Sequence, residues 1–560
     1  MRSFKVLRGG WIAATLGMVV LCGGRIVAQE ASSSAAVSHE AFPTGTATPL
    51  GEKIAALVND PSVSRAHWGI AVTAMDGTPI YGLDEGKLFR PASNAKLFTT
   101  AAAMALLGAD ATVETKILGN LDANGIVTGD LILYGAGDAN FASDDLPYVP
   151  PSQRPQEAQP LHPVKLDDLR AMVDQLQAKG VKRVTGRVIG SDQQFTYEPF
   201  PDSWDVGDLV WGYGAPVSAL TIADNELKLT VTPGKNMGRK EHDFYWAAAV
   251  VLDPNGIPYY TVKSEVQTTP PGTGSHVNVE RLPGSRVLSV YGSMAADASP
   301  DVEEVSIDDP ALYAATALRV LLLQRGIAVD GQAIAPHAES QDARGFLSVV
   351  DGPPPQPKDE NENAQPAFCL LCPIHLTPVL ASHTSVPLKE DVTFTLKVSQ
   401  NLHAELLLHR LGLTVKGGGT TARAGAAVVR GFLLKAGLDP ADFVFYDGSG
   451  LSGHDLVTPR ATAQLLAYAA KQPWFAQWKA ALPVGGEDGT LASRFADAPL
   501  KDHLFAKTGT LGESRALSGY VDTASGKQVI FSIFVDDHAP SGSGDRKVMD
   551  EIVAAIAANE

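Results

Sequence analysis

Short apolar runs bounded by turn residues predict the strands of a sheet. The segments Trp68–Thr73 and Pro79–Leu83 flank the turn Asp76-Gly77, a pattern typical of two paired strands. A third apolar run, Val529–Val535, predicts a buried strand near the other end of the chain. One sheet built from both ends would belong to a domain that is discontinuous in sequence.

Apolar residues at helical spacing predict amphipathic helices. Leu166–Lys179 carries such a face, made of Leu166, Leu169, Met172, Val173 and Leu176. Asp309–Gly326 predicts a helix that returns the chain to the domain of the terminal strands. Asp545 is placed to cap a last helix, whose core-facing residues would be Val548, Met549, Ile552, Val553 and Ile556.

The stretch from Val113 to Gly292 has a different texture, with short strands and tight turns such as Asp122–Gly125. We interpret it as inserted domains of mixed α/β content. The segment Gly135–Asp138 predicts a tight turn and not a dinucleotide site, because the third glycine and the following helix are missing.

Length and charge limit the class of protein. The 560 residues suffice for about three or four domains of ~150 residues each. The formal net charge of −17 argues against a nucleic-acid partner, which requires clustered basic residues, and against a polybasic membrane-binding surface.

The N-terminus predicts a secretory signal peptide. An apolar stretch over Trp11–Leu21 ends before a small-residue cleavage site at Ala28 and is short for a membrane span. The basic residues in front of it are Arg2, Lys5 and Arg8. Cleavage near Ala28 is the first interpretation; a retained anchor and a lipid on Cys22 are the alternatives.

Two cysteines remain after the signal, Cys369 and Cys372. In an exported chain a local disulfide is the first interpretation, because disulfides persist outside the cytosol. Free thiols come next. A metal site comes last, because the pair offers only half of the four ligands that structural zinc takes.

Candidate chemistry begins at Ser93-Asn94-Ala95-Lys96, which opens an Ala-rich apolar helix that Gly108 would end. Residues three apart lie on one helix face, so Lys96 would lie beside Ser93 in a packed site. Burial lowers the pKa of a lysine, and a neutral Lys96 could then activate the Ser93 hydroxyl. The alternative is a helix-capping serine with a surface lysine.

A second motif is Ser399-Gln400-Asn401. Residues two apart do not share a helix face, so Ser399 and Asn401 can converge only from a turn. Asn401 offers a donor and an acceptor to a substrate amide, and Ser399 can relay a proton to a leaving nitrogen. The alternative is the plain start of a helix over Asn401–Leu411.

The third motif, Lys507-Thr508-Gly509-Thr510, lies in a predicted strand. Lys507 and Thr508 supply a charge and a hydroxyl for a terminal carboxylate, and Gly509 would let a ligand approach the backbone. The backbone N–H of Thr510, with that of Ser93, could form an oxyanion hole. The alternative is an edge strand with a solvated lysine.

The order of these motifs is that of penicillin-reactive serine enzymes. The chain resembles the low-molecular-mass class C penicillin-binding proteins, the D-alanyl-D-alanine carboxypeptidase/endopeptidases, from about Leu50 to Asn559. It departs from them at Gln400, where Asp is frequent, and at His454-Asp455. Further matching segments are Gly129–Leu131, Gly135–Asp138, Tyr213–Leu220, Tyr446–Ser452, Val457–Pro459, Leu482–Gly486, Asp488–Leu491 and Leu517–Val521.

The resemblance implies a fold and a domain division. We expect an α/β (α+β) protein whose penicillin-binding-protein/β-lactamase-like catalytic domain has an antiparallel sheet flanked by helices, with a large two-part insertion between Lys96 and Ser399. The expected parts are a signal peptide (1–28), a flexible leader (29–49), the catalytic domain (50–110 and 300–560, with a surface loop over 351–385) and the inserted α/β domains (111–299).

The resemblance also implies a function. We expect an exported, periplasmic serine DD-peptidase that cleaves D-Ala-D-Ala or peptidoglycan crosslinks through an acyl-enzyme on Ser93, without cofactor or metal. Its expected partners are peptidoglycan stem peptides and β-lactams, with peripheral association with the membrane or wall. The insertion would serve substrate access or wall contact and fold separately. A β-lactamase or esterase, and a non-catalytic wall-binding protein, are the rival functions.

Overall fold

The computed structural model describes residues 41–45, 48–143, 147–154, 166–234, 246–252, 255–358, 377–416, 420–540 and 542–559. All of them belong to one compact unit. The predicted signal peptide, most of the predicted leader, Cys369 and Cys372 lie outside the described residues. Within the described residues, no helix has both the length and the apolar character needed to cross a membrane.

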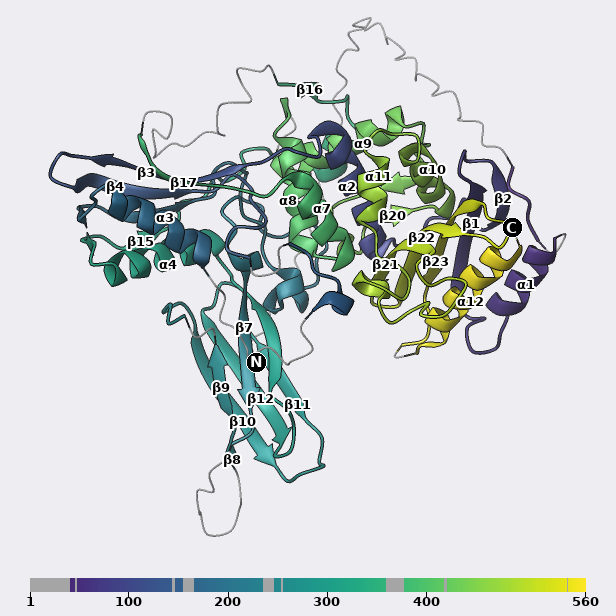
Figure 1. Cartoon of the computed structure of the whole chain (residues 1–560), viewed down its shortest axis with the longest axis horizontal. Helices are drawn as coiled ribbons and strands as arrows, with labels where there is room; N and C mark the ends of the chain where they lie inside the picture. Colours follow the sequence, from purple (N-terminus) through teal and green to yellow (C-terminus); the bar gives the residue numbers. More distant parts are fainter. Residues whose placement is uncertain are drawn as a thin grey trace, which may run out of the picture. The chain divides into compact units, whose positions relative to one another are not determined.

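A five-stranded antiparallel sheet joins the two ends of the chain, as the terminal apolar runs predicted (Figure 1). Its order is β2-β1-β23-β22-β21. The bounds are β1 His67–Ala74, β2 Pro79–Leu83, β21 Leu504–Leu511, β22 Ser514–Asp522 and β23 Gln528–Asp536. The pairing of β1 with β2 confirms the predicted hairpin around Asp76.

Alternation along the strands fills a separate core on each face of this sheet. In β23, Val529, Phe531, Ile533 and Val535 enter one core, while Ile530 and Phe534 enter the other. Successive strand residues point to opposite faces, so a continuously apolar strand supplies both cores. The first core is closed by α1 (Pro49–Val58) and α12 (Gly544–Asn559).

The second core is helical. Its central helix, α2 (Ala95–Leu106), contacts α7, α8 and α9, and α10 packs on the sheet. The bounds of the surrounding helices are α7 Leu388–Lys397, α8 Asn401–Gly412, α9 Thr421–Lys435, α10 Pro459–Ala469 and α11 Phe475–Ala480. The short strands β19 (Phe443–Val444) and β20 (Leu456–Val457) pair beside them.

The insertion contains three further sheets around one large apolar core. The first joins β3 (Glu114–Leu121), β4 (Ile126–Tyr134), β5 (Arg183–Val184), β6 (Val188–Ser191), β14 (Ala328–Val329), β15 (Ala333–Ile334) and β17 (Val379–Thr384). The second joins β7 (Glu226–Thr232), β9 (Ala249–Leu252) and β13 (Asp301–Ser306), and the third joins β8 (Trp246–Ala247), β10 (Thr261–Thr269), β11 (His276–Glu280) and β12 (Val287–Ala295).

Two expectations about the edges of the insertion need correction. The predicted helix after Asp309 forms as α4 (Pro310–Gln324), but it packs in the core of the insertion beside α3 (Asp167–Ala178), not in the domain of the five-stranded sheet. Its sequence is apolar almost all round, so the pattern does not say which core the helix enters. The end of the predicted surface loop 351–385 is β17, which pairs with β3.

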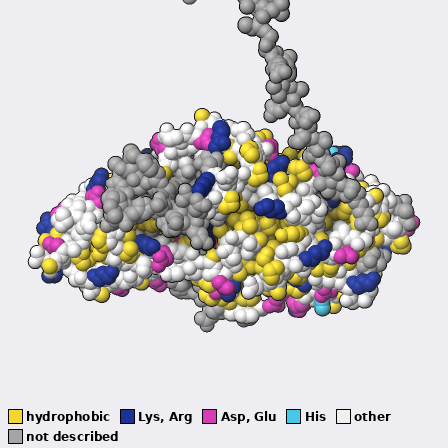
Figure 2. All heavy atoms as spheres, turned by 90° about the horizontal axis from the view of Figure 1, so that it is seen from above, with side chains coloured by type: hydrophobic (Ala, Val, Ile, Leu, Met, Phe, Trp, Pro, Cys, Tyr) yellow, Lys and Arg dark blue, Asp and Glu magenta, His cyan; other side chains and the backbone are white. Residues whose placement is uncertain are grey.

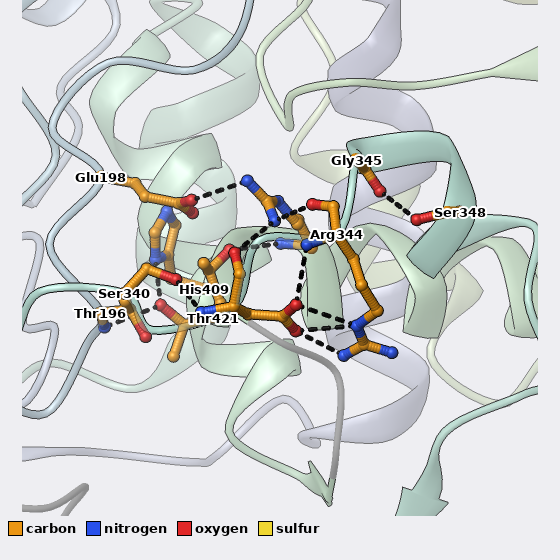
Figure 3. Close-up of polar contacts among 11 residues, drawn as sticks. Thr196, Glu198, Ser340, Arg344, Gly345, Ser348, His409 and Thr421 are labelled. Carbon is orange, nitrogen blue, oxygen red and sulfur yellow. Dashed lines mark hydrogen bonds and ion pairs between the residues drawn. The ribbon is translucent and has the colours of Figure 1, made fainter.

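Polar contacts tie the insertion to the helical core (Figure 3). The backbone N–H of Thr196 donates to the Thr421 hydroxyl (3.2 Å), which also contacts the buried ring of His409 (2.8 Å). Arg423 pairs with Glu198 (3.5 Å) and donates to the Arg344 carbonyl (2.6 Å). The insertion therefore has a fixed contact with α8 and α9.

Candidate active site

Ser93 lies at a sharp turn in front of α2. The turn Ala92–Asn94 leads into the helix, and Ala92 has φ +45°, a conformation that costs free energy for a residue other than glycine. Two glycines make room for this turn: a Cβ on Gly450 would lie 1.8 Å from the Ala92 carbonyl oxygen, and one on Gly509 would lie 2.7 Å from that of Pro91. Ser93 is thereby held at a defined position between two chain segments.

Asn94 anchors this turn to the sheet. Its side chain is fully buried and its amide donates to Ser518 (2.8 Å), which in turn donates to Ser532 (2.9 Å). Because a buried hydrogen bond fixes direction as well as distance, the turn is tied to β22 and β23.

Lys96 lies in the first turn of α2 and is inaccessible to solvent. Its Nζ lies 2.9 Å from the Ser93 hydroxyl, 2.6 Å from Asn401 Oδ1 and 2.8 Å from the Ser449 carbonyl oxygen. The last two atoms can only accept. A neutral amine has two N–H bonds, which these acceptors use, so its lone pair is left for the Ser93 hydroxyl proton.

Electrostatics favour that neutral form. Burial lowers the pKa of Lys96 from 10.5 to about 7, although the carboxylates of Asp447, Glu405 and Asp455 act in the opposite direction. A surface lysine, the alternative for this motif, is therefore wrong. Lys96 is instead a buried amine that can exist unprotonated near neutral pH.

The turn Ser399-Gln400-Asn401 joins α7 to α8. Ser399 has φ +67°, and its hydroxyl accepts from Lys507 (2.8 Å). Asn401 is the first residue of α8, and its amide donates to the backbone carbonyl of Tyr213 in the insertion (2.8 Å) while its oxygen accepts from Lys96. As predicted, Ser399 and Asn401 reach one site from a turn.

Buried ion pairs hold both sides of this turn. Lys397 lies 2.5 Å from Asp488, and His403 lies between Asp391 (2.7 Å) and Asp224 of the insertion (2.8 Å). Burial lowers the pKa of His403, but the two carboxylates outweigh it and raise that pKa to about 10. A charged His403 therefore bridges α7, α8 and the insertion at neutral pH.

The third motif lies on β21, at the edge of the sheet. Lys507 is fully buried, so the solvated lysine considered from the sequence is wrong. Burial and the neighbouring Lys96 lower its pKa well below the usual value. The Thr508 hydroxyl contacts Thr490 (2.7 Å), and Thr510 is exposed and opposite Arg515 in the ladder.

The structure gives a packing reason for the glycine at position 509. Its missing side chain makes space for the backbone before Ser93, with Pro91 and Ala92 in contact distance of a Cβ. Close packing of β21 on the turn that carries Ser93 is therefore one reason for a glycine here, and a close ligand approach at this residue stays a prediction.

The structure thus brings Ser93, Lys96 and Asn401 together in one set of hydrogen bonds, with Ser399 and Lys507 in a second. Sequence reasoning gave no role to Ser449 and Tyr213, although both lie in segments that the resemblance had marked, because a carbonyl oxygen leaves no signature in the side-chain pattern. Thr490 lies in a segment that the resemblance had marked, Asp488–Leu491, but without a role.

A pocket of about 320 Å³ opens beside Ser399 and Asn401. Its far wall comes from the insertion and includes Tyr148, Arg154 and Tyr213. The Tyr148 hydroxyl also accepts from the backbone N–H of Gly489, next to Thr490 (2.8 Å). The insertion is therefore part of the wall of the site.

Comparisons with known proteins agree with this geometry. The model of the D-Ala-D-Ala carboxypeptidase 3 (S13) family matches residues 50–353 and 375–558. A D-alanyl-D-alanine carboxypeptidase from Actinomadura sp. (strain R39) is 31% identical over 91% of this chain and 85% of that protein. The D-alanyl-D-alanine carboxypeptidase DacB of Haemophilus influenzae is 24% identical over 80% of each chain.

The fold is also shared with a solved structure. Penicillin binding protein 4 (dacB) from Haemophilus influenzae matches with a TM-score of 0.71 and 21% identity, over 90% of this chain and 99% of that one. The expected fold, an antiparallel sheet flanked by helices with a large insertion, is confirmed. The chain therefore belongs to the D-Ala-D-Ala carboxypeptidase 3 (S13) family.

Proposed function

We propose that Ser93 is the nucleophile with which this chain, a serine-type D-Ala-D-Ala carboxypeptidase by family, cleaves the stem peptides of peptidoglycan. The observation that carries the assignment is the hydrogen bond between the Ser93 hydroxyl and Lys96, whose other two contacts use up the donors of a neutral amine. Such a pair is the arrangement that activates a serine hydroxyl.

In the acylation step the Ser93 oxygen attacks the carbonyl carbon of the penultimate D-Ala, and Lys96 accepts the hydroxyl proton. The C–N bond then breaks, and the proton passes to the leaving amine through Lys96 and Ser399. Lys507 orients Ser399 through the 2.8 Å contact. Water attacks the ester in the second step, releases the shortened peptide and restores the Ser93 hydroxyl.

The remaining site residues are assigned to binding. Asn401 would hold a substrate amide, and its own orientation is fixed by Lys96 and Tyr213. Lys507 and Thr508 would receive the terminal carboxylate, or its equivalent at a crosslink. The backbone N–H groups of Ser93 and Thr510 would hold the developing oxyanion. These roles need no cofactor.

Location and inhibition follow from the same proposal. Export through the N-terminal signal, with cleavage near Ala28, would place the enzyme beside its substrate in the periplasm. The formal net charge of −17 does not favour binding to an anionic surface, and on the face seen in Figure 2 basic and acidic side chains are interspersed. A β-lactam would acylate Ser93 in place of the peptide.

The test is labelling with a fluorescent penicillin. We expect stable labelling of the wild type and none of Ser93→Ala, while Ser348→Ala, which removes an exposed serine hydroxyl, labels like the wild type. Equal labelling of Ser93→Ala would refute the assignment. Rapid hydrolysis of a chromogenic β-lactam without stable labelling would support a β-lactamase instead.

Purified protein should also be incubated separately with pentapeptide monomers and with crosslinked muropeptides. Release of D-Ala from the first measures carboxypeptidase activity, and conversion of dimers to monomers in the second measures endopeptidase activity. Absence of both, in a protein that still labels, would contradict the proposed substrate.

A further inference from the structure

One hydrogen-bond partner of Lys96 comes from outside the three motifs. This is the backbone carbonyl of Ser449, in the loop Asp447–Ser452 between β19 and β20. A backbone carbonyl can hold an amine in place only if its own loop is fixed. The groups that fix this loop therefore control where the Lys96 lone pair points.

Two buried carboxylates hold the loop. Glu405 accepts from the backbone N–H of Gly448 (3.0 Å) and of Ser449 (2.8 Å). Asp447 accepts from the N–H groups of Gly450 (2.6 Å) and Ser452 (2.7 Å). Together these four hydrogen bonds hold three consecutive residues of the loop and Ser452 in place.

Of these two carboxylates, Glu405 lies on α8, four residues after Asn401. Residues at this spacing share a helix face. One face of α8 therefore sets two of the three contacts of Lys96: Asn401 supplies an acceptor directly, and Glu405 holds the loop that supplies the Ser449 carbonyl. Glu405 itself is inaccessible to solvent and does not touch Ser93.

We propose that Glu405 is a positioning residue for the catalytic amine, which it holds in place through the backbone of Ser449 and beside which its carboxyl group, when ionised, places a buried negative charge. The inference rests on the proposed function, since it assumes that Lys96 is the base.

The charge matters because Glu405 is one of the groups that act on the pKa of Lys96. Burial lowers that pKa, and Asp447, Glu405 and Asp455 raise it, so the balance sets the pH at which the amine becomes neutral. Burial and Asp447 in turn raise the pKa of Glu405 to about 8, so its carboxyl group exchanges its proton in the same range of pH as Lys96. The titratable and charged groups around Glu405 and Lys96 are Asp447 from the loop, Asp455 directly before β20 and Lys507 from β21. Glu198, Asp202, Arg423 and Tyr446 line a pocket of about 200 Å³ with Glu405.

The test is the pH dependence of the rate of acylation by fluorescent penicillin in Glu405→Gln. Loss of this carboxyl group, whose ionised form raises the pKa of Lys96, should move the rise of the rate toward lower pH by up to about one unit, the low end of what a neighbouring charge does. The plateau should fall by about 10- to 100-fold, part of the ~10²- to 10⁴-fold that a positioned base contributes. Glu198→Gln, an identical change in the same pocket that does not touch the loop, should leave both unchanged.

If the pH profile of Glu405→Gln matched that of the wild type, the inference would be overturned even if the plateau fell. A merely structural role would lower the plateau without shifting the pH at which the rate rises. If Glu405→Gln does not fold, Glu405→Asp replaces it: the charge stays, but the shorter side chain cannot reach both N–H groups. That variant should keep the wild-type pH profile with a lower plateau, and a wild-type plateau would overturn the inference. Failure of the proposed function is distinguishable, because either the wild type would then not label or Ser93→Ala would label equally.

Discussion

The rate at which Ser93 is acylated should depend on pH with a midpoint near 7. Only the unprotonated amine of Lys96 can accept the Ser93 proton, and burial lowers the pKa of this lysine from 10.5 to about 7. Because the base must be neutral, the rate should rise with pH and then level off once the amine has lost its proton.

The size of the effect follows from this pKa. With a pKa of about 7, roughly one tenth of the molecules hold a neutral Lys96 at pH 6 and about 1% at pH 5, so the rate should fall about tenfold per unit below pH 6. A lysine at its usual pKa would be neutral in only about 0.03% of molecules at pH 7. The burial of Lys96 thus increases the concentration of active base on the order of a thousandfold.

The assay measures second-order rate constants of labelling by a fluorescent penicillin from pH 5 to 9.5. Lys96→Arg should lose acylation by about 10²- to 10⁴-fold at every pH, because arginine stays charged and general-base catalysis contributes this much. Lys116→Arg, at an exposed ion pair with Glu114 in the insertion, is the matched control and should behave like the wild type. A wild-type rate that does not change with pH, or that still rises at pH 9.5, would refute the reasoning, and an active Lys96→Arg would move the role of base to Ser399.

Two further predictions concern the scaffold of the site. Gly450→Ala would place a Cβ 1.8 Å from the Ala92 carbonyl oxygen and displace the turn before Ser93. The rate of acylation should therefore fall on the order of 100-fold, as expected for a misplacement of about 1 Å. Gly272→Ala, at a glycine with φ +77° but open space around it, is the control and should be acylated at the wild-type rate; equal rates for the two variants would contradict the steric reasoning. Asp488→Asn breaks the buried pair with Lys397 and should cost about 3–5 kcal/mol in the free energy of unfolding, seen as a lower melting temperature, whereas an unchanged melting temperature would show that the pair contributes little.

Much of the local structure could be predicted from the sequence, because local structure depends on patterns that are local too. The hairpin around Asp76, the amphipathic helix α3 and the final strand and helix all form where apolar periodicity placed them. In α12 the predicted core residues Val548, Met549, Ile552, Val553 and Ile556 are all buried. The periodicity succeeded here because it fixes the type and the bounds of an element, whatever core the element enters.

Periodicity failed where an element could enter more than one core. The nearly uniform apolar surface of α4 fits the insertion as well as the domain of the five-stranded sheet, and only long-range packing decided between them. β17 is short, so its pairing with β3 could not be seen in its own sequence. The separate folding of the insertion stays a prediction.

The sequence by itself determined which chemical groups are available: the order of the three motifs named the nucleophile, the amine and the amide. Only the tertiary structure decided their state and their surroundings. Burial makes Lys96 a base near neutral pH, and backbone carbonyls of Ser449 and Tyr213, distant in sequence, orient Lys96 and Asn401. The physical reason is that desolvation and backbone hydrogen bonds depend on what packs around a residue, which no local pattern of side chains encodes.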